Sequence, residues 1–159
     1  MPAYTIKPLV TATAINTGGR SGHSETTDHS VSVNLSVRKE MGGPGLPDTT
    51  TPEHLFAAGY AACFGGAIEF VARQHKKDVK GTIVTCATSV GPREGGGFGI
   101  AVRMQVKIPT LPHDEALALV NETHEKVCPY SHATRGNIPS SARSAEMAGD
   151  CTVRDPALA

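Results

Sequence analysis

The chain has 159 residues, a length typical of one domain that buries about two-thirds of its unfolded surface. Fifteen basic residues balance fifteen acidic ones, so no net charge attracts nucleic acid or an anionic membrane. Aromatic residues are few, with four Phe, three Tyr and no Trp, which argues against a platform for base stacking. We therefore expect neither nucleic acid nor a membrane as a partner.

Two further features concern the compartment. The amino-terminal residues 1–8 lack the basic and apolar regions of a secretion signal, and residues 55–68 form an apolar stretch shorter than the ~20 residues that span a bilayer. The sequence thus predicts a cytoplasmic protein with a buried core helix. In that compartment, four cysteines are more often reactive or simply buried than paired in a disulfide framework.

The amino-terminal third of the chain predicts strands and loops. Residues 4–15 are rich in Thr, Val and Ile, which favours a first strand, and residues 17–22 form a Gly-rich loop whose one charge is Arg20. Apolar and polar residues alternate strictly over 31–37, the period of a half-buried strand. Residues 42–47 form a loop by composition.

A helix, a hairpin and a second helix are predicted next. Helix signals begin at residues 51–53, and the helix is expected to run to about residue 75. Strands over 82–90 and 98–108 are expected to pair around three glycines, which leave the register loosely fixed. The apolar residues of the second strand are expected on one face: Ile100, Val102, Met104, Val106 and Ile108. The second helix begins near residue 113 and must end at Cys128, because proline follows.

The tail after residue 138 has no clear pattern, although residues 151–153 could form a short closing strand. Strands and helices come in blocks, which predicts an α+β fold with mainly antiparallel pairing. We expect a single domain over residues 1–159.

Cys63 lies inside the apolar, small-residue helix, and such a thiol is normally inert because desolvation disfavours the thiolate. One interpretation is a small core residue; the other is a reactive thiol activated by a positive charge. Arg20 could supply that charge, since a guanidinium stays protonated even in a dry pocket, or it could be an ordinary solvated loop residue. Lowering a thiol pKa from ~8.5 to ~5.5 would need about 4 kcal/mol.

Cys128 is the natural second thiol, although the sequence alone cannot establish contact with Cys63. A disulfide would require Cα atoms within ~4.4–6.8 Å, and the alternative is a free cysteine at a helix end. Cys86, in a predicted strand, and Cys151, near the tail, have no evident activator. The spacing of His124, Cys128 and His132 also allows a zinc site, although no fourth ligand is obvious.

Four segments carry a resemblance to a known family. They are residues 18–23 (GGRSGH), 51–64 (TPEHLFAAGYAACF), 95–99 (GGGFG) and 124–138 (HEKVCPYSHATRGNI). Together they closely resemble the organic hydroperoxide resistance (Ohr) proteins of the Ohr/OsmC superfamily. The match runs in order from about residue 3 to residue 138, whereas residues 139–159 depart from the family pattern, which usually closes with a short apolar strand.

The resemblance implies an intertwined homodimer in which antiparallel sheets wrap around two central helices. It also implies a thiol peroxidase that reduces alkyl and fatty-acid hydroperoxides to alcohols. Cys63 matches the peroxidatic cysteine, Cys128 the resolving cysteine that forms a disulfide with it, and Arg20 the arginine that stabilises the thiolate and polarises the peroxide. Glu53 matches the glutamate that holds this arginine. In the family, dihydrolipoyl groups on lipoylated proteins reduce the disulfide, and no metal or nucleotide is needed.

Two expectations go beyond the match. Tyr130 and Phe98 are candidate lining residues of the substrate pocket. Glu53 and Cys63 are ten positions apart, so on one straight helix they would lie ~15 Å from each other. Either the helix is interrupted between them or Glu53 reaches the site from the second subunit, and we favour the second arrangement.

Alternative functions remain at this level. The same fold could serve as a non-catalytic redox-sensing or binding module, in which Cys63 would be oxidised without turnover. Within the enzymes, the OsmC branch is the near neighbour, and the segments around Arg20 and Cys128 favour the Ohr branch.

Overall fold

The computed structural model describes residues 4–138, 140–142 and 150–151 of the chain. Its contacts divide the chain into two compact units, Met1–Pro52 and Glu53–Ala159. Each unit is described by itself.

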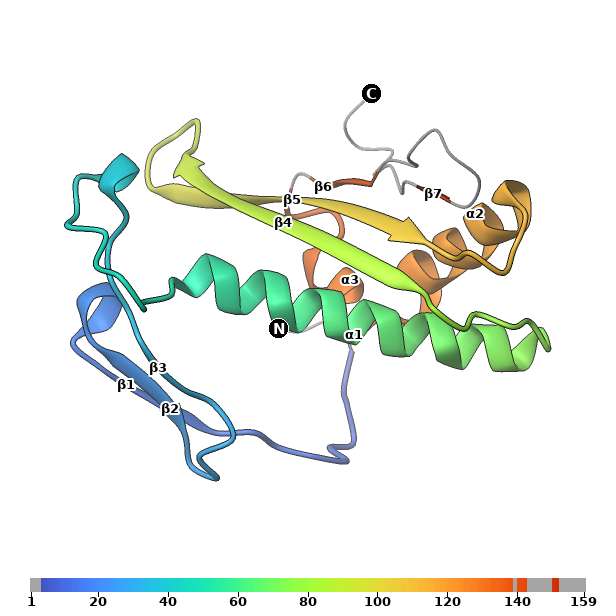
Figure 1. Ribbon diagram of the computed structural model, residues 1–159, viewed down its shortest axis with the longest axis horizontal. Coiled ribbons are helices and arrows are strands. Elements are labelled where there is room, and N and C mark those ends of the chain that lie inside the picture. Colours follow the sequence, from blue (N-terminus) through green and yellow to red (C-terminus); the bar gives the residue numbers. More distant parts are fainter. Residues whose placement is uncertain (1–3, 139, 143–149, 152–159) are drawn as a thin grey trace. The chain divides into compact units, whose positions relative to one another are not determined.

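The first unit is a three-stranded antiparallel sheet with strand order β1-β2-β3 (Figure 1). A 3₁₀ turn, η1 (Gly19–Ser21), joins the first two strands, and a second, η2 (Lys39–Met41), follows the third. The strands are β1 (Ala14–Thr17), β2 (His23–Thr26) and β3 (Ser32–Asn34).

The sequence predicts this unit only in part. The strand expected over residues 4–15 is wrong for most of its length, because residues 4–13 adopt no regular structure and only the last two belong to β1. The strand expected over 31–37 is shorter, although Leu35 extends it through a bridge to Thr50. Strand β2 was not predicted, since its sequence HSET lacks the apolar alternation of a half-buried strand.

Glycine shapes the turn that carries Arg20. Gly18, before η1, has φ 82°, and a Cβ atom on Gly22 would lie 1.7 Å from the Thr17 carbonyl oxygen. Only glycine avoids both the strained backbone and the clash, so the tight connection between β1 and β2 requires it.

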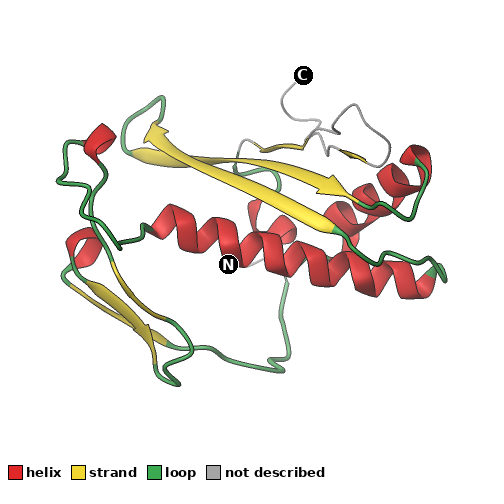
Figure 2. Cartoon of the chain, viewed as in Figure 1, coloured by secondary structure: helices red, strands yellow, loops and turns green. Residues whose placement is uncertain are grey.

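The second unit places one long helix beneath a two-stranded hairpin (Figures 1 and 2). Its sheet has the order β4-β5-β6, and β7 also pairs with β5. The elements are α1 (Pro52–Gln74), β4 (Ile83–Pro92), β5 (Phe98–Lys107), α2 (His113–Glu122), the π-helical turn η3 (Thr123–Val127), α3 (Pro129–Thr134), β6 (Ser140–Ala142) and β7 (Asp150–Cys151).

Helix α1 confirms the prediction of a helix over 51–75. It is long and apolar enough to cross a membrane by length and composition, with a mean hydropathy of 1.6 over 18 residues. However, core helices meet the same criterion, and one face of α1 belongs to the hydrophobic core shared with β5 and α2. The buried residues of that face recur at intervals of three and four: Tyr60, Phe64, Ala67, Ile68, Val71 and Ala72.

The hairpin is also confirmed, and its register is continuous from Ile83↔Lys107 to Pro92↔Phe98. The three turn glycines, residues 95–97, all have positive φ. Alternate residues of β5 face the core as predicted: Val102, Met104 and Val106 are buried, as is Ile108 just beyond the strand. Ile100, nearer the turn, is only half-buried.

The tail contributes two short strands. β6 pairs parallel with β5 through Val102↔Ser140, and β7 pairs antiparallel through Val106↔Cys151. The closing strand expected at 151–153 therefore begins within β7, whereas residues 152–153 lie outside the described residues. The same holds for most of the divergent segment after residue 138.

Substitutions of Gly22 and Gly19, in the turn that carries Arg20, compare the cost of a steric clash with the cost of backbone strain. Gly22→Ala should lower the free energy of unfolding by more than about 2 kcal/mol, because the new Cβ would overlap the Thr17 carbonyl. Gly19→Ala should cost only about 1 kcal/mol, since Gly19 has φ 59° but open space around it. Urea unfolding measures both, and equal losses would contradict this order.

Candidate active site

Two thiols that are 65 positions apart in the sequence meet in the second unit. The Sγ atoms of Cys63, in α1, and Cys128, after η3, lie 3.8 Å apart, and both cysteines are unpaired. Cys63 is half-buried and Cys128 is 1% exposed. The contact that the sequence could not establish is therefore present, and a disulfide needs only a small further approach of the two sulfur atoms.

A π-helical turn presents Cys128. A single helix was predicted over 113–128, but the α-helix ends at Glu122 and the chain continues as η3. At the end of η3, the Cys128 N–H donates a hydrogen bond of 2.9 Å to the Thr123 carbonyl. This five-residue spacing holds one residue more than an α-turn, which redirects the side chains that follow. Cys128 then has an extended backbone, and Pro129 opens α3 as its first residue.

An aromatic cluster joins α1 to the segment that follows Cys128. Phe56, Tyr60 and Tyr130 form a cluster with ring centroids 5.6–6.0 Å apart. Tyr130 is 39% exposed, and a Cβ atom on Gly59 would lie 3.3 Å from its hydroxyl oxygen. The glycine thus leaves room for Tyr130 against α1, and the predicted pocket residue Tyr130 lies beside the thiols.

Phe98, the other predicted pocket residue, has a different setting. It is the first residue of β5, beside the glycine turn, and is 72% exposed. Nothing among the described contacts joins it to either thiol.

Burial raises the pKa of the Cys63 thiol. A hydrogen bond from the Tyr130 backbone lowers this pKa, and the neighbouring Cys128 thiol raises it again. No basic side chain among the described residues of the second unit contributes to the shift. A reactive thiolate at Cys63 therefore needs a positive charge in addition to these groups.

The two candidate charged residues come from different parts of the chain. Arg20 belongs to η1 of the first unit, and Glu53 is the second residue of α1. Because α1 is continuous from Pro52 to Gln74, Glu53 and Cys63 of one chain are ~15 Å apart along the helix axis. The interrupted helix, one of the two arrangements considered above, does not occur.

The zinc alternative finds no support among residues 4–138, where no three His, Cys, Asp or Glu side chains converge as metal ligands. His124 is buried in η3, whereas His132 is exposed in α3.

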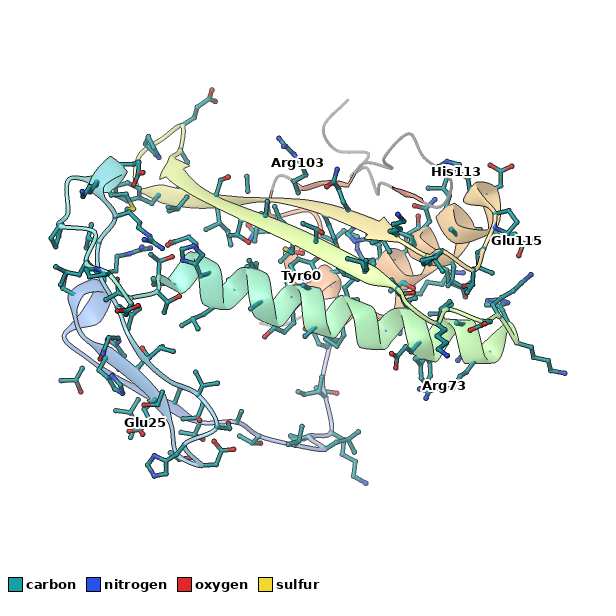
Figure 3. All side chains as sticks on the ribbon, viewed as in Figure 1. Glu25, Tyr60, Arg73, Arg103, His113 and Glu115 are labelled. Atoms are coloured by element: carbon teal, nitrogen blue, oxygen red, sulfur yellow. The ribbon has the colours of Figure 1, made fainter. Side chains whose placement is uncertain are left out.

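Sequence reasoning missed a buried hydroxyl cluster beside the thiols. The Tyr60 hydroxyl lies 2.9 Å from Ser131 Oγ and 3.2 Å from Thr134 Oγ1. In Figure 3, Tyr60 lies between α1 and α3. Each residue taken alone is unremarkable in the sequence, and no local pattern signals the cluster, because Tyr60 and Ser131 are 71 positions apart and meet only when α3 packs on α1.

Comparison with known proteins identifies the family. Residues 43–143 match the model of the OsmC-like protein family. The organic hydroperoxide resistance protein of Xanthomonas axonopodis pv. citri is 48% identical over 133 residues, which cover 83% of this chain and 92% of that protein. OhrB of Bacillus subtilis is 41% identical over 82% of this chain and 93% of its own length.

Solved structures agree. A crystal structure of a putative organic hydroperoxide resistance protein from Vibrio cholerae, with captopril in one of its active sites, superposes with a TM-score of 0.83 at 40% identity. The superposed region covers 92% of this chain and 99% of the Vibrio cholerae chain. The chain belongs to the OsmC-like family, and within it to the organic hydroperoxide resistance proteins. The predicted α+β, OsmC-like fold of the chain and the predicted family are thereby confirmed, whereas the homodimer stays a prediction.

Cys86 offers a test of thiol burial. Burial raises the pKa of this half-buried thiol, so the folded chain keeps a proton that the unfolded chain loses near pH ~8.5. The unfolded state then binds fewer protons, and the free energy of unfolding should fall as pH rises above about 8.5. Urea unfolding between pH 7 and 10 should show a shallower fall for Cys86→Ala than for the wild type. Parallel curves would contradict the assignment.

Proposed function

We propose that Cys63 and Cys128 form the redox couple of this organic hydroperoxide reductase, a thiol peroxidase that detoxifies organic peroxides. The observation that carries the proposal is the 3.8 Å contact of the two sulfur atoms in a member of the organic hydroperoxide resistance family. The apolar and aromatic surroundings of Cys63 suit alkyl and fatty-acid hydroperoxides, whose chains are themselves apolar.

In the first step, the Cys63 thiolate attacks the distal oxygen of the hydroperoxide. An S–O bond forms, the O–O bond breaks, and the alkoxide leaves and takes up a proton to give the alcohol. Cys63 is thereby oxidised to a sulfenic acid.

In the second step, the Cys128 thiol attacks the sulfenic sulfur of Cys63. A disulfide forms, and the sulfenic oxygen leaves as water. Two thiols of a dihydrolipoyl group on a lipoylated protein then reduce the disulfide by exchange and are themselves oxidised to the lipoyl disulfide. The cycle needs no bound metal or nucleotide.

Arg20 is proposed to supply the positive charge that Cys63 needs. Desolvation opposes ionisation of Cys63, and a guanidinium is a charge that burial does not remove. The same group can hydrogen-bond the peroxide oxygens, and Glu53 would hold it in place by an ion pair.

Glu53 is proposed to act from the second subunit of a homodimer. The unbroken α1 places Glu53 far from Cys63 of the same chain. A dimer would also cover apolar surface that a single chain exposes, because the side chains of Ile6, Leu9 and Val10 are 74%, 97% and 88% exposed. We further propose that the protein acts in the cytoplasm, where lipoylated proteins are available as reductants.

Variants of Cys63, Cys128 and Arg20 test the proposed roles of these three residues. Cys63→Ser should abolish reduction of an alkyl hydroperoxide with dihydrolipoamide. Cys128→Ser should react once and then stop, because no disulfide forms. Arg20→Ala should slow the attack at least about tenfold at pH 7, because burial keeps the Cys63 thiol protonated when the positive charge that favours the thiolate is removed. The loss should shrink as the pH approaches 9.

Cys86→Ser serves as the matched control and should keep wild-type turnover. Full activity of Cys63→Ser would refute the proposal, whereas oxidation of wild-type Cys63 without turnover would favour a redox sensor.

Mixed dimers test the arrangement of Glu53. Glu53→Ala and Cys63→Ser dimers should each be impaired. In a mixed dimer of the two, the intact Cys63 faces the intact Glu53 of the other subunit if Glu53 acts across the interface. Differently tagged subunits, isolated as the mixed species, should then recover about half of the wild-type turnover. Activity no higher than that of the Glu53→Ala dimer would show that Glu53 acts within its own chain.

A further inference from the structure

The buried hydroxyl cluster joins the two cysteine-bearing segments. Tyr60 is 2% exposed, Ser131 is 0% exposed and Thr134 is 4% exposed. Three hydroxyl groups in a core would be costly without partners, but these satisfy one another. Tyr60 comes from α1, and the other two come from α3, directly after Cys128.

The hydrogen bonds of the cluster have a consistent direction. The Thr134 hydroxyl donates its proton to the Tyr130 carbonyl at 2.9 Å, so at the 3.2 Å contact it must accept from Tyr60. The Tyr60 proton is then committed, and the 2.9 Å contact is a bond donated by Ser131. A chain of bonds thus runs from Ser131 through Tyr60 and Thr134 to the Tyr130 carbonyl.

This chain ends on the peptide segment that adjoins both sulfur atoms. The Cys128 carbonyl accepts a 2.9 Å bond from the His132 N–H, which ties the cysteine to α3. The Tyr130 backbone hydrogen-bonds to Cys63. The start of α3 therefore contacts Cys63, carries Cys128, and is fixed to α1 through the hydroxyl of Tyr60.

We propose that Tyr60, Ser131 and Thr134 are positioning residues for disulfide formation, which hold the turn of Cys128 against α1 after Cys63 has been oxidised. The inference rests on the proposed function. In it, the cluster determines how much of the oxidised Cys63 forms the disulfide and how much is oxidised irreversibly. The two sulfur atoms must approach from 3.8 Å to the ~2.05 Å of a disulfide, so a turn held in place needs only a short movement.

Two reactions compete for the Cys63 sulfenate. Attack by Cys128 gives the disulfide and water. Attack by the sulfenate sulfur on a second hydroperoxide forms another S–O bond, breaks the O–O bond and gives an alcohol and a sulfinate, which dihydrolipoyl groups do not reduce. The first reaction is intramolecular, so its rate depends on how well the thiol is positioned, and a misplacement of about 1 Å can cost up to ~100-fold.

The test is Tyr60→Phe, which keeps the ring in the aromatic cluster and removes only the hydroxyl. In stopped-flow experiments with one equivalent of an alkyl hydroperoxide, the variant should oxidise Cys63 at a rate within about twofold of the wild-type rate. Disulfide formation should slow roughly tenfold, because a buried hydrogen-bond partner is lost. At increasing peroxide, mass spectrometry should find the sulfinate, a gain of two oxygen atoms on Cys63, at roughly tenfold lower peroxide than in the wild type.

Ser131→Ala removes the hydroxyl on α3 that contacts Tyr60, and it should likewise slow disulfide formation and increase the sulfinate. This second variant tests the inference if Tyr60→Phe fails to fold. Val71→Ala is the control for general destabilisation, because Val71 is a fully buried residue of the same helix two turns beyond Cys63. Thr110→Val removes a hydroxyl that bonds the Asp78 carbonyl at 2.6 Å, outside the cluster. Both controls should keep the wild-type ratio of disulfide to sulfinate.

A wild-type ratio in both Tyr60→Phe and Ser131→Ala would overturn the inference, as would an equal change in Val71→Ala. These outcomes leave the proposed function standing, because Cys63 oxidation and turnover are measured in the same samples. Failure of wild-type Cys63 to react with hydroperoxide would overturn both.

Discussion

The burial of one face of α1 is the interaction on which the second unit depends. That face supplies much of the core under β5, and it also carries Cys63 into surroundings that raise the thiol pKa. The same apolar packing that stabilises the fold therefore suppresses the reactivity of its central thiol. Chemistry at Cys63 requires compensating groups: the backbone of Tyr130 in α3 supplies one hydrogen bond, and Arg20 is the proposed source of positive charge.

The π-helical turn before Cys128 determines how the chain passes from α2 to α3. A regular helix continued to Cys128 would leave this residue on the helical path, and Pro129 would remove one backbone donor. The π-helical turn ends the helix instead, frees Cys128 into an extended conformation and lets Pro129 begin α3. The buried hydroxyl cluster then attaches α3 to α1. The three hydroxyl groups of this contact satisfy one another in the core.

Prediction from sequence succeeded where periodicity was strong. Helix α1, the β4–β5 hairpin and the apolar face of β5 were all anticipated, because long alternating or helical patterns reflect burial directly. Prediction failed in the first unit, where residues 4–13 have strand-like composition but no regular structure. β propensity measures the fit to neighbouring strands, and composition alone does not supply a neighbour. The π-helical turn was also missed, since Pro129 marks the end of a helix but not its form.

The sequence by itself determined the family of the protein and the residue types of the proposed site. The sequence alone shows three features of that site: Cys63 in an apolar helix, Cys128 before a proline and Arg20 in a glycine-rich turn. Only the tertiary structure decided that the two thiols are 3.8 Å apart and that Tyr60 joins their segments. Contacts over 65 and 71 positions arise from the packing of α3 on α1, and no local pattern encodes a distance between elements that meet only when the chain is folded.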